Sequence, residues 1–138
     1  MSRPGRAPDT VLASFGPDLP RASVFLKPAS LRLSRPPSSL HVWIELPPGF
    51  SAREIDPNRA AITAVGKKTL SRPVRRIAAK GATIADRDRD GRPELVVYFP
   101  VKPLLRYLPA GARTRLKLES PLRTWGRFLG YGTLRATR

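Results

Sequence analysis

The sequence contains no cysteine and only one histidine, His41, among its 138 residues. The absence of cysteine excludes disulfides, thiolate zinc sites and a thiol nucleophile. Because the chain has one histidine and no cysteine, any catalytic triad of the Ser-His-Asp type would have to use His41. His41 falls on the more polar face of an expected strand, where an exposed imidazole is a simpler interpretation than a catalytic one. We therefore expect a noncatalytic protein.

Acidic residues are also scarce. Ten Asp and Glu stand against 26 Lys and Arg, which gives a formal net charge of +16 and a sequence pI near 11.7. Such a charge favours binding to polyanions: nucleic acid, acidic polysaccharide or anionic lipid headgroups. The alternative is a compositional bias toward arginine, because the chain has twenty arginines and six lysines. Both interpretations stay open.

Long apolar runs are missing too. No stretch approaches the ~18 apolar residues that a membrane-spanning helix needs. Residues 1–21 lack the apolar core of a signal peptide and, with their prolines and glycines, are expected to form a flexible lead-in. Two interpretations follow: the protein stays inside the cell, or its leader lies elsewhere.

Sixteen prolines and ten glycines divide the chain into short segments in which apolar and polar residues alternate. This pattern predicts an all-β fold, with one domain over residues 22–138. One short helical turn is expected at 104–108, where Pro103 stands at a tolerated first position. The sequence predicts an antiparallel β-sandwich of seven or eight short strands. The expected strands are 23–27, 31–33, 40–46, 60–65, 73–79, 94–99, 113–119 and 127–136.

Alternation also predicts which side chains face a shared core. Two glycines in the last expected strand, Gly130 and Gly132, indicate a bulge or a close backbone approach. The expected inward residues are Leu40, Val42, Ile44 and Leu46, then Leu95, Val97 and Phe99, then Leu116 and Leu118.

The most distinctive stretch runs from Asp86 to Glu94 and holds four of the ten acidic residues. Acids stand at positions 1, 3, 5 and 9 of a loop, and Gly91 stands at position 6. Ca²⁺ takes oxygen ligands in this spacing, including a backbone carbonyl at position 7. The predicted calcium ligands are Asp86, Asp88, Asp90, the carbonyl of Arg92, and Glu94.

This loop is not an EF-hand, because Val97 occupies the position of the bidentate Glu and the following residues favour a strand. The alternative is a solvated Asp-Gly turn without metal, and nearby arginines keep that alternative open. A glycosidase carboxylate pair would have to come from the same acids, which are better explained as metal ligands.

A second candidate site is the stretch 57–85, which contains seven basic residues and no acid. It is the best polyanion-binding patch in the sequence, although a run of charge is usually a solvated face. Its candidate contact residues are Lys67, Lys68, Arg72, Arg75, Arg76 and Lys80. Aromatic residues near the C-terminus, among them Trp125 and Tyr131, are interpreted as ordinary packing in the last hairpin rather than as a stacking surface.

A series of motifs, in the same order along the chain, resembles a family of Ig-like β-sandwich modules found in bacterial and archaeal extracellular proteins. The Val-x-Ile-Glu-Leu-Pro-x-Gly-Phe strand is matched at 42–50, and the Asp-x-Asp-x-Asp-Gly loop with its Leu-Val-Val-x-Phe strand at 86–99. The other matches are the Val-Phe-Leu-Lys-Pro opening at 24–31, the Ile-Asp-Pro turn at 55–57, the leucine-containing turn at 104–111 and the closing Leu134-Arg135.

The resemblance covers about residues 22–136. It implies a calcium-stabilised module that serves as a spacer, an adhesion domain or a carbohydrate-side accessory, with no catalysis. It also implies an extracellular or cell-surface location and calcium ligation by Asp86, Asp88, Asp90 and Glu94. The alternative is a basic protein that binds nucleic acid or acidic polysaccharide through the 57–85 patch.

Overall fold

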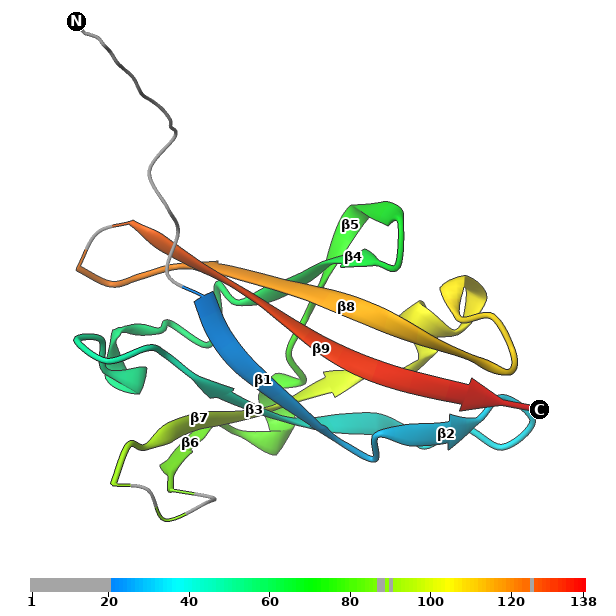
Figure 1. The fold of residues 1–138 in the computed structure, drawn as a ribbon, viewed down its shortest axis with the longest axis horizontal. Coiled ribbons are helices and arrows are strands. Elements are labelled where there is room, and N and C mark those ends of the chain that lie inside the picture. Colours follow the sequence, from blue (N-terminus) through cyan, green and yellow to red (C-terminus); the bar gives the residue numbers. More distant parts are fainter. Residues whose placement is uncertain (1–20, 87–88, 90, 125) are drawn as a thin grey trace, which may run out of the picture.

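The computed structural model describes residues 21–86, 89, 91–124 and 126–138. These residues form nine strands and three short 3₁₀ helices (Figure 1). The strands are β1 (Arg21–Lys27), β2 (Ser30–Arg32), β3 (Ser39–Glu45), β4 (Ala61–Val65), β5 (Lys68–Arg75), β6 (Thr83–Ala85), β7 (Glu94–Pro100), β8 (Ala112–Pro121) and β9 (Arg127–Thr137). The helices are η1 (Ala52–Glu54), η2 (Ala78–Lys80) and η3 (Lys102–Tyr107).

All nine strands belong to one curled sheet. Its order is β5-β4-β8-β9-β1-β3-β7-β6, and β2 pairs with β9 beside this path. The sheet curls so that the half containing β8 and β9 lies opposite the half containing β3 and β7 (Figure 1). The pairs of β9 with β1 and with β2 are parallel, whereas the other ladders are antiparallel. An all-β fold is therefore present, but its sheet is mixed rather than wholly antiparallel.

The core lies between the two facing halves, as alternation along the strands predicted. Ile44 and Val97, from one half, are fully buried in the same cluster as Leu116 and Leu118 from the other. Every residue expected to point inward belongs to this cluster. The burial of these apolar side chains is the main favourable term that stabilises the fold.

Gly130 and Gly132 allow β1 to lie close against β9. A Cβ atom at Gly130 would come within 2.7 Å of Val24 Cγ2 and 3.0 Å of the Ala22 carbonyl oxygen. At Gly132 a Cβ would stand 3.1 Å from atoms of both Val24 and Leu26. The sequence indicated either a bulge or a close backbone approach at these glycines, and the structure shows the close approach.

Element boundaries differ from expectation at two places. The strand expected at 73–79 starts earlier, because the Gly66–Lys67 turn joins β4 to β5 directly and pairs Val65 with Lys68. Residues after Arg75 leave the sheet and form η2. Residues 83–85 form a further short strand, β6, which pairs with β7. The short helix around Pro103 is confirmed as η3.

Candidate functional site

The predicted calcium loop joins β6 to β7 at one edge of the sheet, where Ala85 pairs with Glu94. Its first and sixth positions are joined, since the Gly91 amide donates a 2.8 Å hydrogen bond to Asp86 Oδ2. Gly91 has φ +83°, a backbone conformation that favours glycine. Asp88 and Asp90, two of the predicted ligands, lie outside the described residues.

Glu94, the predicted ligand at position 9, is fully buried although it does not point into the apolar core. It precedes Leu95 on β7, and Leu95 belongs to the core, so alternation places Glu94 on the outer face. Burial there requires charge or hydrogen-bonding partners, because an unpaired carboxylate out of water costs several kcal/mol. Glu94 is accordingly not without an interacting partner in the fold.

Arg92 contributes more than the backbone carbonyl for which the sequence selected it. Its guanidinium contacts Glu45 Oε2 at 3.3 Å and donates a 2.7 Å hydrogen bond to the Leu46 carbonyl. These contacts fasten the loop to the end of β3. Glu45 is itself only 8% exposed. In the sequence, Glu45 is only one residue of the motif at 42–50. The residues around it do not indicate that it lies beside the 86–94 loop.

Among the described residues, no three His, Asp or Glu side chains come close enough together to hold a metal ion. Three of the predicted ligands, Asp86, Arg92 and Glu94, lie at the described ends of the loop, and the remaining two fall outside that part of the chain. The calcium site therefore stays a prediction.

Four residues of the predicted polyanion patch, Arg72, Arg75, Arg76 and Lys80, lie on β5 and in the segment that follows it. Arg76 donates hydrogen bonds to Asn58 Oδ1 at 3.2 and 2.8 Å, and Arg75 donates to the Asn58 carbonyl at 3.2 Å. Lys80 lies 5.3 Å from the Tyr98 ring centroid, on the β3–β7 side of the sheet. Arg72 is exposed on β5. Arg75 and Arg76 therefore share Asn58 as a partner, and the polyanion patch over 57–85 stays a prediction.

Lys67 and Lys68, from the same predicted patch, line a groove of about 510 Å³. Arg113 and Arg115 of β8 line the same groove, with Tyr107 and Pro109. Within the described ranges, no acidic residue lines this groove. Alternation along β8 is enough to predict from the sequence that Arg113 and Arg115 face outward. Their position beside the lysines of the β4–β5 turn depends on the pairing of β4 with β8, which the sequence does not show.

Aromatic rings form a row across the outer face of β1, β3 and β7. His41 stacks on Tyr98, with ring centroids 4.4 Å apart and planes at 13°, and it contacts Trp43 at 3.9 Å. Phe25 pairs with Trp43 across β1 and β3 and is 39% exposed. Burial, followed by the charge of Lys27, lowers the pKa of His41 below its usual 6.5. His41 is half-buried and stacked, rather than freely exposed as the sequence suggested.

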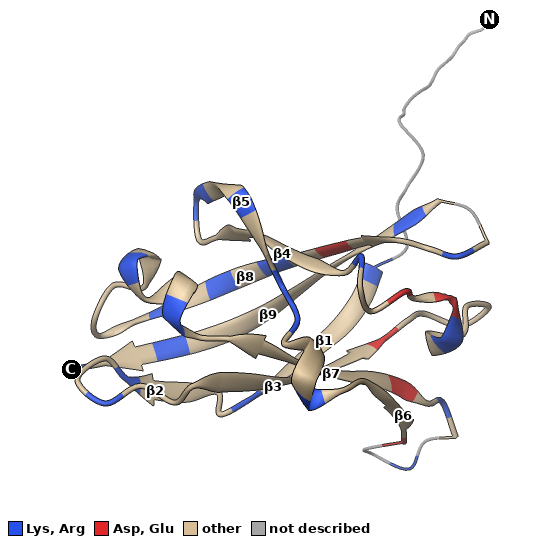
Figure 2. Cartoon of the chain, turned by 180° about the vertical axis from the view of Figure 1, so that it is seen from behind, with Lys and Arg blue, Asp and Glu red and all other residues tan. Residues whose placement is uncertain are grey.

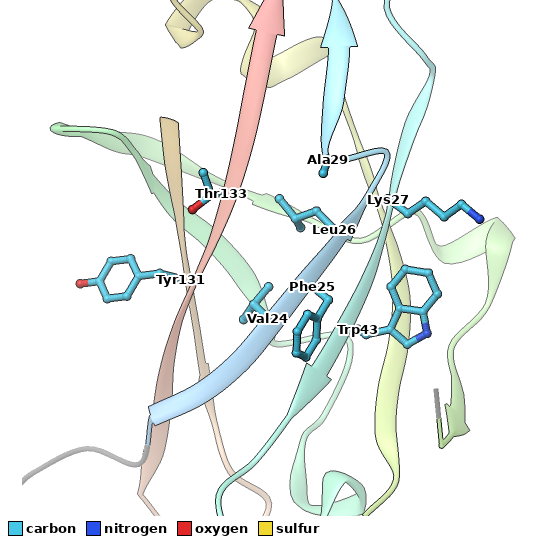
Figure 3. Close-up of a pocket in the computed structure, with 8 residues that line it drawn as sticks. All are labelled: Val24, Phe25, Leu26, Lys27, Ala29, Trp43, Tyr131 and Thr133. Atoms are coloured by element: carbon cyan, nitrogen blue, oxygen red, sulfur yellow. The ribbon is translucent and has the colours of Figure 1, made fainter. Parts of the chain in front are cut away.

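Phe25 and Trp43 also border an open groove of about 750 Å³ between β1 and β9 (Figure 3). Its other lining residues are Val24, Leu26, Lys27, Ala29, Tyr131 and Thr133. The groove opens because the parallel ladder of β1 with β9 ends at the Ser23–Tyr131 pair. Figure 3 shows Phe25 and Trp43 side by side on one face, while Tyr131 extends from β9 away from them.

Charge is unevenly distributed over the fold. Acidic positions gather toward one end, whereas basic positions continue along the rest of the chain (Figure 2). On β8, Glu119 neutralises two cations: it lies 3.7 Å from Lys117 and 2.8 Å from Arg127. A hydrogen bond from Thr63 (2.6 Å) is the largest cause of its lowered pKa, and the two cations add to it.

Comparison of the chain with protein-family models, with curated proteins and with solved structures found no match. In the part of the chain that the structure describes, no helix has the length and apolar character needed to cross a membrane. Function must therefore be inferred from the residues of the chain itself.

Proposed function

We propose that this protein is a noncatalytic structural or interaction module, of spacer or adhesion type, that folds as an Ig-like β-sandwich and is stabilised by Ca²⁺ at the 86–94 loop. In an Ig-type sandwich, strands A, B, E and D form one sheet, while C, F and G form the other, with C′ added beside C in some members. If β2, which lies off the main strand path, is left out and β5 is taken as C′, lettering the other strands in chain order gives A-B-E-D for β1-β3-β7-β6 and C′-C-F-G for β5-β4-β8-β9. This order supports the Ig-like assignment.

One observation carries the calcium proposal: the closed loop from Asp86 to Gly91 leads directly into the buried carboxylate of Glu94. This hydrogen bond joins Asp86 and Gly91, the residues at positions 1 and 6 of the calcium-binding pattern. Acids packed into a small volume repel one another, and a hard cation among them relieves that repulsion. Arg92 already supplies one positive charge to this region, through Glu45.

Polyanion binding is a second candidate function. The observation that favours it is the groove in which Lys67 and Lys68 meet Arg113 and Arg115 without an acidic neighbour in the lining. This arrangement keeps only two residues of the predicted 57–85 patch and adds two arginines from β8. It requires no contribution from the calcium loop.

Thermal unfolding in chelator and in millimolar Ca²⁺ tests the calcium proposal. We expect a Kd on the order of 10⁻⁴–10⁻³ M, as for extracellular calcium modules, because the twelfth-position Glu is missing. Calcium at ten times Kd then stabilises the fold by about 1.4 kcal/mol, since only the folded form binds it. Magnesium is expected to do less, because it holds its water and demands tighter geometry.

Single replacements Asp88→Asn and Asp90→Asn should abolish the calcium response. Asp56→Asn is the matched control, since Asp56 lies in a separate turn, where its side chain accepts a hydrogen bond from the Asn58 amide that asparagine can also accept. Equal melting temperatures in chelator and in millimolar calcium, for wild type and for the loop variants, would reduce the 86–94 stretch to a simple turn.

A further inference from the structure

The groove between β1 and β9 continues into two neighbouring grooves. A smaller groove of about 280 Å³ shares Ala29 and Thr133 with it and adds Arg113 and Arg135. The groove beside Lys67 and Lys68 in turn shares Arg113 with the smaller one. The three grooves therefore follow one another along the surface through shared lining residues, from the Phe25–Trp43 pair to the β4–β5 turn.

This path, which we call the basic aromatic track, is defined by Phe25, Lys27, Trp43, Arg113, Arg115 and Arg135. Among the residues that the structure describes, no Asp or Glu lines any of its three grooves. In the described part of the chain, its cations form no salt bridge, in contrast to Lys117 and Arg127, which share Glu119. Arg115 is held over the Tyr131 ring at 4.5 Å, which fixes its guanidinium on the outer face.

The chemistry of the track selects among polyanions. Its first groove is lined mainly by apolar side chains, and among the described lining residues Lys27, Trp43, Tyr131 and Thr133 offer polar groups. These few groups can pair with only some of the hydroxyls of a sugar ring, so the groove gives a sugar little hydrogen-bonding specificity. A nucleic-acid base presents a π-face to an aromatic side chain and keeps its polar edges in water. Arginine forks bind phosphate in a bidentate manner.

A duplex is a poorer ligand than a single strand, because its bases are stacked inside and cannot reach Phe25 and Trp43. Single-strand binding proteins combine the two features found here: a positively charged groove along the backbone and aromatic rings for successive bases. We propose that the basic aromatic track binds single-stranded nucleic acid, with a base stacked at Phe25–Trp43 and phosphates along Arg113, Arg135 and Arg115.

Fluorescence anisotropy with a labelled oligothymidylate of about 15 nucleotides tests the proposal, with the full chain in chelator at about 50 mM salt. We expect binding that weakens with salt at a log–log slope of about −0.7 for each phosphate contacted. The unlabelled single strand should compete better than a duplex of equal length or an acidic polysaccharide such as heparin. Binding should be the same in calcium, because the 86–94 loop lies outside the track, so this test and the calcium test succeed or fail separately.

Variants can distinguish binding by the basic aromatic track from attraction to the net positive charge of the protein. Phe25→Leu should weaken binding about 5- to 150-fold, the range measured for losing one aromatic–base stack, whereas Phe25→Tyr should keep wild-type affinity. Arg113→Gln with Arg135→Gln should reduce both the affinity and the salt slope. The control, Arg53→Gln with Arg59→Gln, removes the same charge from exposed residues that line none of the three grooves.

Three results would overturn the proposal. One is the absence of binding at about 50 mM salt, well below the range where phosphate contacts are screened. Another is equal loss of affinity in the track pair and in the control pair, which would show a response to net charge alone. The third is stronger competition by duplex or heparin than by the single strand, together with unchanged affinity in Phe25→Leu, which would assign the surface to another polyanion.

Discussion

Glu45 follows Ile44 and Glu94 precedes Leu95, and Ile44–Leu95 is the last pair of the β3–β7 ladder, so the two acids stand at the same end of the two strands on the outer face. Both are shielded from solvent, at 8% and 0% exposure. Like charges placed directly opposite on neighbouring strands are destabilising. The Arg92 guanidinium, 3.3 Å from Glu45, offsets part of this repulsion. The acidic loop and the end of β3 therefore form one electrostatic unit.

Replacing Arg92 with Gln should lower the free energy of unfolding in chelator by about 1–3 kcal/mol, because it removes the guanidinium that lies 3.3 Å from the nearly buried Glu45 carboxylate. If calcium binds the loop, millimolar calcium should recover part of this loss. Urea unfolding measures both effects. Arg89→Gln, which removes a second guanidinium from the same loop, is the matched control and should change stability by less. An Arg92→Gln protein as stable as wild type in chelator would contradict the role of this contact.

Replacing Glu94 with Gln should have opposite effects in chelator and in calcium. In chelator the variant should be at least as stable as wild type, because one of two facing carboxylates loses its charge. In calcium it should be stabilised less, with an apparent Kd at least about tenfold weaker, since affinity in such loops depends on the number of charged ligands. Calcium-dependent melting measures both. An unchanged calcium response would remove Glu94 from the ligand set.

His41 should make stability depend on pH. Its pKa is lowered in the folded state by burial and by Lys27, so the unfolded chain binds the proton more readily. The stability that neutral His41 contributes is complete above its usual pKa of 6.5 and is lost as pH falls through the lowered folded pKa. Urea unfolding at a series of pH values should show this decline, and His41→Gln should flatten it. A slope that is identical in the variant would assign the pH dependence to other groups.

Strand-level features of this fold could be predicted from sequence because burial imposes period-two alternation. Ile44, Val97 and Leu118 were correctly placed in the core for that reason. The parallel contact of β1 with β9 could not be predicted, since no local pattern encodes which strand edge a segment will join. The strand at Lys68–Arg75 was misplaced because Pro73 suggested a strand start, whereas the Gly66–Lys67 turn sets the pairing.

The candidate sites show the same division. The loop from Asp86 to Glu94 was visible because its ligand types are adjacent in sequence. The contact of Arg92 with Glu45 joins residues 47 positions apart, and the track joins Phe25 to Arg113, so tertiary pairing alone creates them. Within the basic run 57–85, Arg75 and Arg76 are hydrogen-bonded to Asn58, whereas Lys67 and Lys68 line a groove with Arg113 and Arg115, a neighbourhood that the run itself does not encode.

Gly130→Ala should destabilise the fold more than Gly132→Ala. At Gly130 the added methyl would meet Val24 Cγ2 at 2.7 Å and the Ala22 carbonyl oxygen at 3.0 Å, so backbone as well as side chain must move. At Gly132 its neighbours, at 3.1 Å and beyond, are side-chain atoms that can shift. We expect a loss of about 1–3 kcal/mol at Gly130, the usual cost of overpacking. Urea unfolding of both variants measures the difference.

A second replacement locates the cause of this loss. Val24→Ala in the Gly130→Ala background removes the closest atom, so the double variant should be more stable than the sum of the two single losses predicts. The rescue should be partial, because the Ala22 carbonyl remains 3.0 Å away. Strict additivity of the two losses, or a Gly130→Ala protein as stable as wild type, would mean that β1 does not lie against β9 at the distance on which the groove beside Phe25 depends.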